Sequence, residues 1–140
     1  MKIYFAGSIR GGRHDIEIYK QIIEHLKKYG EVLTEHVGED SISKDGEVNL
    51  TDKYIHDRDF NWIDECDVFI AEVTTASLGV GYEIRTAIEM NKKILCIYRP
   101  EQTKRVSAMV TGAPKVKTEP YSTIEEVKKI IDKFVKDVKF

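Results

Sequence analysis

The segment from residue 67 to residue 90 constrains the fold of this chain more than any other part of the sequence. Asp67 to Val73 is an almost continuous apolar run, typical of a strand buried on both faces of a parallel sheet. A polar turn with two glycines follows, and apolar residues then recur at helical spacing, at Val80, Ile84, Ala87 and Ile88. This pattern predicts a strand, a turn and a helix, and free helical N–H groups at such a turn favour an anionic ligand.

The same alternation of apolar runs and helical patterns extends along the whole chain. Strands are predicted at residues 2–6, 31–35, 68–73, 93–98 and 115–118. A first helix is predicted to carry Tyr19–Leu26 on its inner face and to stop at Gly30. Further helices are predicted at about 52–65, from the glycine turn to about Met90, at 104–110 and at 124–135. Strands that alternate with helices favour a parallel sheet with right-handed crossovers. We therefore predict an α/β protein, a three-layer sandwich with a mostly parallel, five-stranded sheet of Rossmann or flavodoxin-like order, as a single domain over residues 1–140.

The composition argues against several classes of function. The formal net charge is −2, so the charge predicts no binding to nucleic acid or to an acidic membrane surface. No long apolar segment indicates membrane insertion or secretion. Cys66 and Cys96 lie in or beside apolar runs and are expected to be reduced core residues, and no Cys/His/Asp spacing predicts a metal site. We expect a cytoplasmic protein without a metal.

Two carboxylates lie on the apolar faces of predicted helices. Glu83 follows Val80 by three residues and precedes Ala87 by four, so it shares their face. Asp59 precedes Ile63 by four residues in the same way. A buried carboxylate is costly unless it is partnered or used, and either one alone could be a structural acceptor. Two of them on adjacent helices favour the cleavage of a glycosidic bond, which ordinarily uses a carboxylate pair.

The remaining polar features leave alternatives open. Residues 7–13 form a glycine-rich loop after the first strand, but its spacing fits neither the dinucleotide fingerprint nor a Walker loop. It is either an ordinary turn with an exposed arginine or a phosphate site with Ser8 and Arg10 as donors. His36 ends the second predicted strand and could touch a substrate, whereas His14, His25 and His56 are expected on helix surfaces. Residues 38–50 are expected to form a mobile surface loop.

Blocks of sequence along residues 3–112 resemble the 2′-deoxynucleoside 5′-monophosphate N-hydrolases of the nucleoside 2-deoxyribosyltransferase superfamily. In family order, these blocks are Tyr4–Arg13, Leu33–Val37, Ile55–Trp62, Ala71–Thr74, Ser77–Glu83, Ile94–Cys96 and Ser107–Met109. Each block is weak alone, but together they are specific. Residues 38–50 and everything after Gly112 match no motif of the family.

The resemblance implies hydrolysis of the bond between the base and deoxyribose in a deoxynucleoside monophosphate, without a cofactor. Glu83 is implied to attack C1′, Asp59 to transfer protons, and Tyr4 to orient the nucleophile. The implied substrate-binding residues are Gly7, Ser8, Ile9, Arg10, Gly11, Gly12, His36, Ser77, Gly79, Ser107 and Met109. Ser107 is implied to reach the site of the other subunit in a homodimer.

Three rival interpretations remain open. A nucleoside 2-deoxyribosyltransferase shares the carboxylate but needs no phosphate site, so the serines and the arginine of the two loops speak against it. The sequence poorly distinguishes a ribonucleotide N-glycosidase of the CMP type from a deoxynucleotide N-hydrolase. A non-catalytic nucleotide sensor would not need two inward carboxylates.

Overall fold

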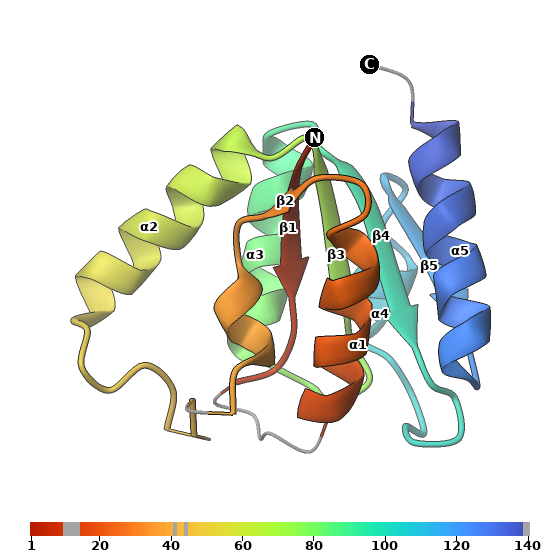
Figure 1. Ribbon diagram of the computed structural model, residues 1–140, viewed down its shortest axis with the longest axis horizontal. Helices are drawn as coiled ribbons and strands as arrows, with labels where there is room; N and C mark the ends of the chain where they lie inside the picture. The colour runs from red at the N-terminus through yellow and green to blue at the C-terminus, as the bar shows by residue number, and fades with distance from the viewer. Residues whose placement is uncertain (10–14, 41, 44, 139–140) are drawn as a thin grey trace.

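The computed structural model describes residues 1–9, 15–40, 42–43 and 45–138, and within them the strands form one sheet (Figure 1). The strands are β1 (Lys2–Ala6), β2 (Glu31–Val32), β3 (Val68–Glu72), β4 (Lys93–Tyr98) and β5 (Val116–Pro120). The helices are α1 (Ile16–Leu26), the 3₁₀ helix η1 (Glu35–Gly38), α2 (Asp52–Glu65), α3 (Leu78–Glu89), α4 (Ala108–Thr111) and α5 (Ile124–Asp137). The sheet order is β2-β1-β3-β4-β5 and each neighbouring pair is parallel, which confirms the predicted α/β fold and its flavodoxin-like order.

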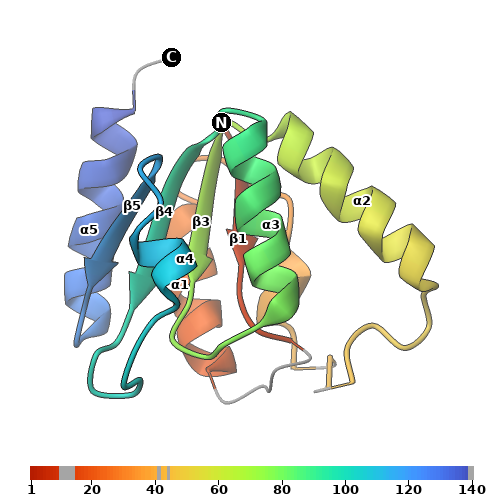
Figure 2. The same cartoon turned by 180° about the vertical axis from the view of Figure 1, so that it is seen from behind.

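Helices cover both faces of the sheet. Figure 1 shows α1 and α5 in front of one face, and Figure 2, from behind, shows α3 and α4 in front of the other. In both views α2 slants away from the sheet, with its C-terminal end near the sheet and its N-terminal end far from it. Ile63, in the last turns of α2, is its one buried residue.

Alternation along the strands decides which side chains face which layer. On β1, Ile3 and Phe5 belong to the core under α1 and α5, whereas Tyr4 belongs to the core on the opposite face. On β3, Phe69 lies on the same face as Tyr4, and the two rings stack with centroids 5.1 Å apart. Because successive residues of a strand point to opposite faces, the phenol of Tyr4 points toward α2 and α3.

The predicted strand at 31–35 is wrong in its second half. β2 ends at Val32, and the side chain of Thr34 continues the contact with β1 by accepting from Phe5 N (2.8 Å) and donating to Phe5 O (2.6 Å). The hydroxyl thus replaces the backbone partner that a longer strand would supply. The chain turns into η1 at once, so His36 lies in a 3₁₀ helix rather than at the end of a strand.

Other differences concern the segments between elements. The helix predicted at 104–110 is shorter and later, at Ala108–Thr111, because Ser107 caps it by accepting from Met109 N. His25 is buried rather than on the surface, and its Nε2 lies 2.6 Å from Asp132 on α5. In the segment 38–50, Ile42 is buried and Glu47 is held by an ion pair, so this segment packs against the protein in part. None of the helices in the described residues is long and apolar enough to cross a membrane.

Candidate active site

A cavity of about 600 Å³ lies between α2, α3 and the loops that follow β1 and β3. The cavity therefore lies at the carboxyl edge of the strands, where ligands bind in open α/β sheets. Both carboxylates that the sequence singled out, Asp59 and Glu83, line it. Apolar side chains form much of the remaining wall, at Ile9, Ile55, Phe60, Ile63, Leu78 and Val80. A largely apolar wall with a few convergent polar groups is typical of a small-molecule site.

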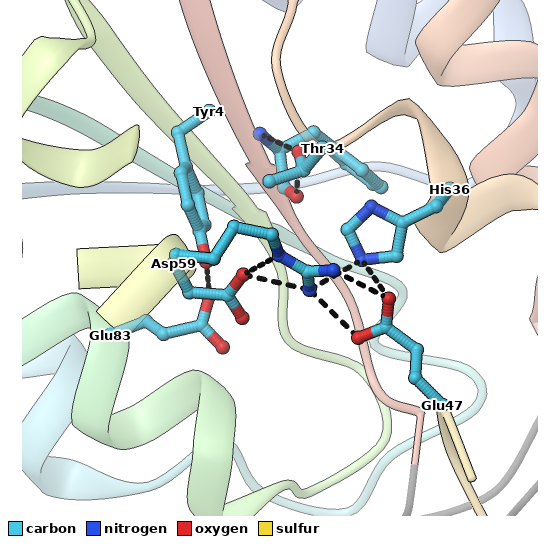
Figure 3. Close-up of polar contacts among 8 residues, drawn as sticks. Tyr4, Thr34, His36, Glu47, Asp59 and Glu83 are labelled. Carbon is cyan, nitrogen blue, oxygen red and sulfur yellow. Dashed lines mark hydrogen bonds and ion pairs between the residues drawn. The ribbon is translucent and has the colours of Figure 1, made fainter. Parts of the chain in front are cut away.

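Glu83 points from the second turn of α3 toward β1. The hydroxyl of Tyr4 donates a short hydrogen bond to Glu83 Oε2 (Figure 3). The second oxygen, Oε1, lies on the side of Gly79, where a Cβ added to the glycine would be 3.9 Å from it. No residue in the described part of the chain hydrogen-bonds to Oε1. Tyr4 thus fixes one oxygen of the carboxyl group and leaves the other available in the cavity.

Asp59 approaches from α2 and lies beside Glu83 in Figure 3. Its Oδ1 accepts from Arg58 Nε at 3.0 Å and lies 2.9 Å from Arg58 Nη2. Within the described residues, no hydrogen bond reaches Oδ2. Each of the two carboxyl groups therefore has one anchored oxygen and one oxygen without a protein partner.

Arg58 also holds the segment that precedes α2. Its Nη1 and Nη2 donate to the two oxygens of Glu47 at 2.8 Å and 2.7 Å, a bidentate arrangement. The guanidinium packs on the ring of Trp62, 4.7 Å from its centroid. His36 completes the cluster, with Nε2 3.5 Å from Arg58 Nη2 and 3.6 Å from Glu47 Oε1. Glu47 lines the cavity, so this pairing shapes one of its walls.

Burial controls the protonation of the carboxyl pair. Desolvation, helped by the nearby charge of Asp59, raises the pKa of Glu83 to about 8 against the opposing effects of the Tyr4 hydrogen bond and the charge of Arg58. Desolvation also raises the pKa of Asp59, against the opposing charge and hydrogen bond of Arg58. Because the pKa of Glu83 is about 8 and the charge of Asp59 contributes to that rise, the carboxyl pair carries a proton at neutral pH. Two carboxyl groups with raised pKa values, able to hold and pass a proton, therefore face the same cavity.

The first turn of α3 forms the opposite end of the cavity. Ser77 caps the helix by accepting from Val80 N at 3.3 Å, and both Ser77 and Gly79 line the cavity. Gly7 and Ile9, from the loop after β1, line it as well. At Gly7 the ring of Tyr19 approaches so closely that a Cβ would lie 2.8 Å from it, so glycine is required there. The free N–H groups at the N-terminus of α3 thus lie at the same end of the cavity as the close-packed turn at Gly7. Such an arrangement favours the binding of an anion.

Several predicted site residues lie elsewhere. Ser8 is fully buried behind the cavity wall, and in the described ranges its Oγ has no hydrogen-bond partner. His36 is not part of the wall and contacts the Arg58–Glu47 pair instead. Ser107 and Met109 are exposed on α4 and its cap, outside this chain's cavity. Arg10, Gly11, Gly12 and His14 lie outside the described residues.

Sequence reasoning missed Glu47 and the inward position of Arg58. The sequence pattern does not single out Arg58, yet its side chain is only 14% exposed and lies under the segment that carries Glu47. The neighbouring aspartate was a usable signal, because an arginine next to an inward acid can turn toward it. Glu47 had no such signal, since it lies in a polar segment without periodicity. No group of three or more His, Cys, Asp or Glu side chains in the described residues is arranged to hold a metal ion.

The model of the nucleoside 2-deoxyribosyltransferase family matches residues 3–130. The chain belongs to this family. Among its relatives, the 5-hydroxymethyl-dUMP N-hydrolase of Danio rerio is 51% identical over 137 residues, covering 96% of this chain and 95% of that protein. The enzyme of the same name from Esox lucius is 59% identical over 115 residues, covering 81% and 79%. These comparisons confirm the family predicted from the sequence blocks.

A solved structure of another protein shares the fold of this chain. A CMP N-glycosidase from Clostridium botulinum superposes with a TM-score of 0.65, covering 96% of this chain and 99% of that one. The two sequences are 21% identical, so the comparison confirms the α/β fold. The relatives named above are enzymes that act on N-glycosyl compounds.

Proposed function

We propose that this chain is a hydrolase that cleaves the N-glycosidic bond of 2′-deoxynucleoside 5′-monophosphates, as one domain over residues 1–140. The products are the free base and 2-deoxyribose 5-phosphate. The observation that carries the proposal is the pair of carboxyl groups of Asp59 and Glu83, on separate helices, that face one cavity with one oxygen each unpartnered among the described residues. The relatives named N-hydrolases, at about half identity, support the same reaction.

Glu83 is the nucleophile in this proposal. Its ionised carboxylate attacks C1′ as the bond to the base nitrogen breaks, and the resulting positive charge on the sugar stabilises the ionised form. Tyr4 holds Oε2 so that Oε1 can approach C1′. Asp59 donates the shared proton to the departing base. It then accepts a proton from the water that attacks C1′, which releases Glu83 and completes retaining hydrolysis.

The other end of the cavity binds the 5′-phosphate in this proposal. Ser77, Gly79 and the N-terminus of α3 supply donors, and Gly7 lets the backbone of the first loop approach. The buried Ser8 Oγ, without a partner in the described residues, would be satisfied by a phosphate oxygen or by a donor held by it. Arg10, Gly11, Gly12 and Ile9 complete the loop, and their roles rest on the family resemblance.

The preference for a 2′-deoxy sugar has a chemical basis. A sugar without the electron-withdrawing 2′-oxygen forms a cationic transition state more easily. Tyr4, buried beside Glu83, adds a steric barrier to a hydroxyl at that position. The CMP N-glycosidase of the same fold is the reason to keep ribonucleotide cleavage as the second candidate.

The site is completed by a second copy of the chain in this proposal. Leu78 and Met109, on α3 and α4, are 97% and 84% exposed, and both helices lie on one face of the molecule (Figure 2). Exposed apolar side chains grouped on one face are typical of an interface. Ser107, with Met109, then reaches the partner's cavity, and the dimer acts in the cytoplasm. Mixing two inactive variants, Glu83→Gln and Ser107→Ala, should restore activity in hybrid dimers, because one site then has both groups.

A chromatographic screen for released base tests the function. Wild type is incubated with 2′-deoxynucleoside 5′-monophosphates, including 5-hydroxymethyl-dUMP, with the matching ribonucleotides, and with unphosphorylated deoxynucleosides. Base release from phosphorylated deoxynucleosides supports the proposal. Release from CMP or GMP at equal rates favours the ribonucleotide alternative. Base exchange between deoxynucleosides favours a deoxyribosyltransferase, and tight binding without any release favours a sensor.

A further inference from the structure

Arg58 links two acidic side chains of the cavity wall. Its side chain is 14% exposed and contacts Glu47 and Asp59, which both line the cavity. Arg58 itself is not among the lining residues. The arginine therefore lies behind the wall and holds two side chains that form it.

We propose that Arg58 is a positioning residue for the cleavage reaction, which uses one guanidinium to fix the Asp59 carboxyl group and to hold the Glu47 segment as the base-side wall of the cavity. The proposal rests on the N-hydrolase function proposed above and adds a residue to it. The proposal also places the two ends of the substrate. The phosphate lies at the N-terminus of α3, and the base lies against the segment held by Arg58.

The position of the base follows from the proton that it must receive. Asp59 can protonate the departing base only if the base lies on the Asp59 side of the sugar. The wall on that side is formed by Gly46 and Glu47 together with the first turns of α2, at Asp52, Ile55 and His56. Glu47 is tied to the second turn of α2 by its bidentate contact with Arg58, while Thr51, at the end of the segment, only caps the helix by accepting from Tyr54 N. Loss of the contact with Arg58 would release the wall.

The geometry requires arginine rather than any cation. Two parallel hydrogen bonds reach Glu47 while Nε and Nη2 contact Asp59, and the flat face of the guanidinium packs on Trp62. A lysine ammonium has no planar fork and cannot make these contacts together. Lysine at this position would keep the charge but lose the orientation, so the two effects can be separated experimentally.

The charge of Arg58 acts on groups from several elements. It faces Glu47 from the preceding segment, Asp59 on its own helix, and His36 on η1. Its field also lowers the pKa of Glu83 on α3 and of Tyr4 on β1. A nearby cation favours ionised carboxylates, so removing the charge raises the pKa of both Asp59 and Glu83. If the singly protonated pair is the active form, both limbs of the pH profile then move to higher pH.

Three variants and one control test the proposal by kcat, KM and the pH dependence of kcat/KM. We expect Arg58→Lys to lower kcat about 10-fold with an unmoved pH profile, because a small misplacement of a catalytic group is costly. Arg58→Gln should lower kcat at least as much and move both limbs to higher pH. Glu47→Gln should lower kcat several-fold. KM should rise a few-fold in all three, since each variant loosens the wall on the base side, which Glu47 lines. Lys53→Gln, which removes an exposed cation from the same helix, should behave as wild type.

A second readout does not depend on turnover. In ¹³C NMR titrations of the side-chain carboxyl groups, Asp59 and Glu83 should titrate at higher pH in Arg58→Gln than in wild type, and unchanged in Arg58→Lys. Wild-type kcat and profile in both Arg58 variants, even with a lower melting temperature, would make the residue merely structural and overturn the inference. An unmoved titration in Arg58→Gln would overturn it too. Failure of wild type to release base would overturn the proposed function, while the titrations would still decide the role of Arg58.

Discussion

Two clusters of charged residues lie at the carboxyl edge of the same sheet, one on each face. On the side of α2 and α3, Asp59 and Glu83 face the cavity with Arg58 behind them. On the side of α1 and α5, Arg99 lies 2.5 Å from Asp15 Oδ1 and 3.3 Å from Glu72 Oε2. Both clusters gather carboxylates around one arginine in largely buried surroundings.

The two clusters differ in how many carboxylate oxygens have partners. Glu72 Oε1 accepts from the backbone N (2.7 Å) and the hydroxyl of Thr74, and Asp15 Oδ2 accepts from Thr75 Oγ1 at 2.8 Å. With Arg99 on the remaining oxygens, every oxygen of this cluster is occupied. In the cavity, one oxygen of Asp59 and one of Glu83 have no partner within the described residues.

In this chain, the number of carboxylate oxygens with a hydrogen-bond or ion-pair partner, rather than burial, distinguishes structural acids from reactive ones. Glu72 is fully buried and its pKa is raised by desolvation, as that of Glu83 is, so burial and pKa alone would class the two together. The Asp15–Glu72–Arg99 cluster ties the start of α1 to the loop that leads to Ser77. It therefore supports the proposed phosphate end without taking part in the reaction.

The largest effect is expected at Asp59. Asp59→Asn removes the proton donor and should lower kcat by roughly 10²–10⁴, the usual contribution of general acid–base catalysis. The variant should also lose the fall in kcat/KM near pH 8, because the shared proton no longer exists. Steady-state kinetics across pH measures both. Asp57→Asn, an exposed acid two residues earlier, is the control, and an equal loss there would remove the special role of Asp59.

The opposite kind of effect is expected at Glu72. Glu72→Gln breaks a buried pair and should destabilise the protein by about 3 kcal/mol, measured by denaturant unfolding. At a temperature where the variant stays folded, its pH profile should match wild type. A shifted profile would mean that the two clusters communicate and that the distinction drawn between them is wrong.

A smaller effect is expected at Ser77. Ser77→Ala removes a helix cap, at a cost of about 1 kcal/mol, and also a proposed phosphate donor. KM for a deoxynucleoside monophosphate should rise several-fold. Thr123→Ala removes the equivalent cap of α5, where Oγ1 accepts from Glu126 N, and is a matched control. Equal KM values in the two variants would argue against phosphate binding at α3.

The smallest effect is a gain in stability from loss of the nucleophile. The pKa of Glu83 in the folded protein, about 8, lies above the value of 4.5 usual for an exposed glutamate, so the folded protein holds a proton that the unfolded chain releases. Its carboxyl group therefore lowers the stability progressively as pH rises from about 4.5 to 8. Glu83→Gln should be more stable than wild type by about 0.5–1 kcal/mol at pH 8 and by little at pH 4.5. Melting temperatures at the two pH values test this, and a gain at pH 4.5 alone would contradict it.

Much of the fold could be predicted because each element carries its own pattern. The apolar runs at β1, β3 and β4 and the helical spacing around Glu83 were sufficient, and the same spacing placed Asp59 on an inward face. The end of β2 could not be predicted, because the Thr34 side chain replaces the ladder through contacts with β1. The Glu47–Arg58 contact was equally hidden, since it joins an irregular segment to a helix face. Glu72, a lone acid in an apolar strand, predicts a buried polar cluster, although the sequence does not identify Arg99 as its partner.

The most direct test of the account compares base release by wild type and by Glu83→Gln, with 5-hydroxymethyl-dUMP and the ordinary deoxynucleoside monophosphates as substrates. Wild type should liberate free base and 2-deoxyribose 5-phosphate in equal amounts, and the variant should liberate neither while keeping a melting temperature at or above that of wild type. If the variant released base at the wild-type rate, the carboxyl group held by Tyr4 would not be the nucleophile and the account would be contradicted.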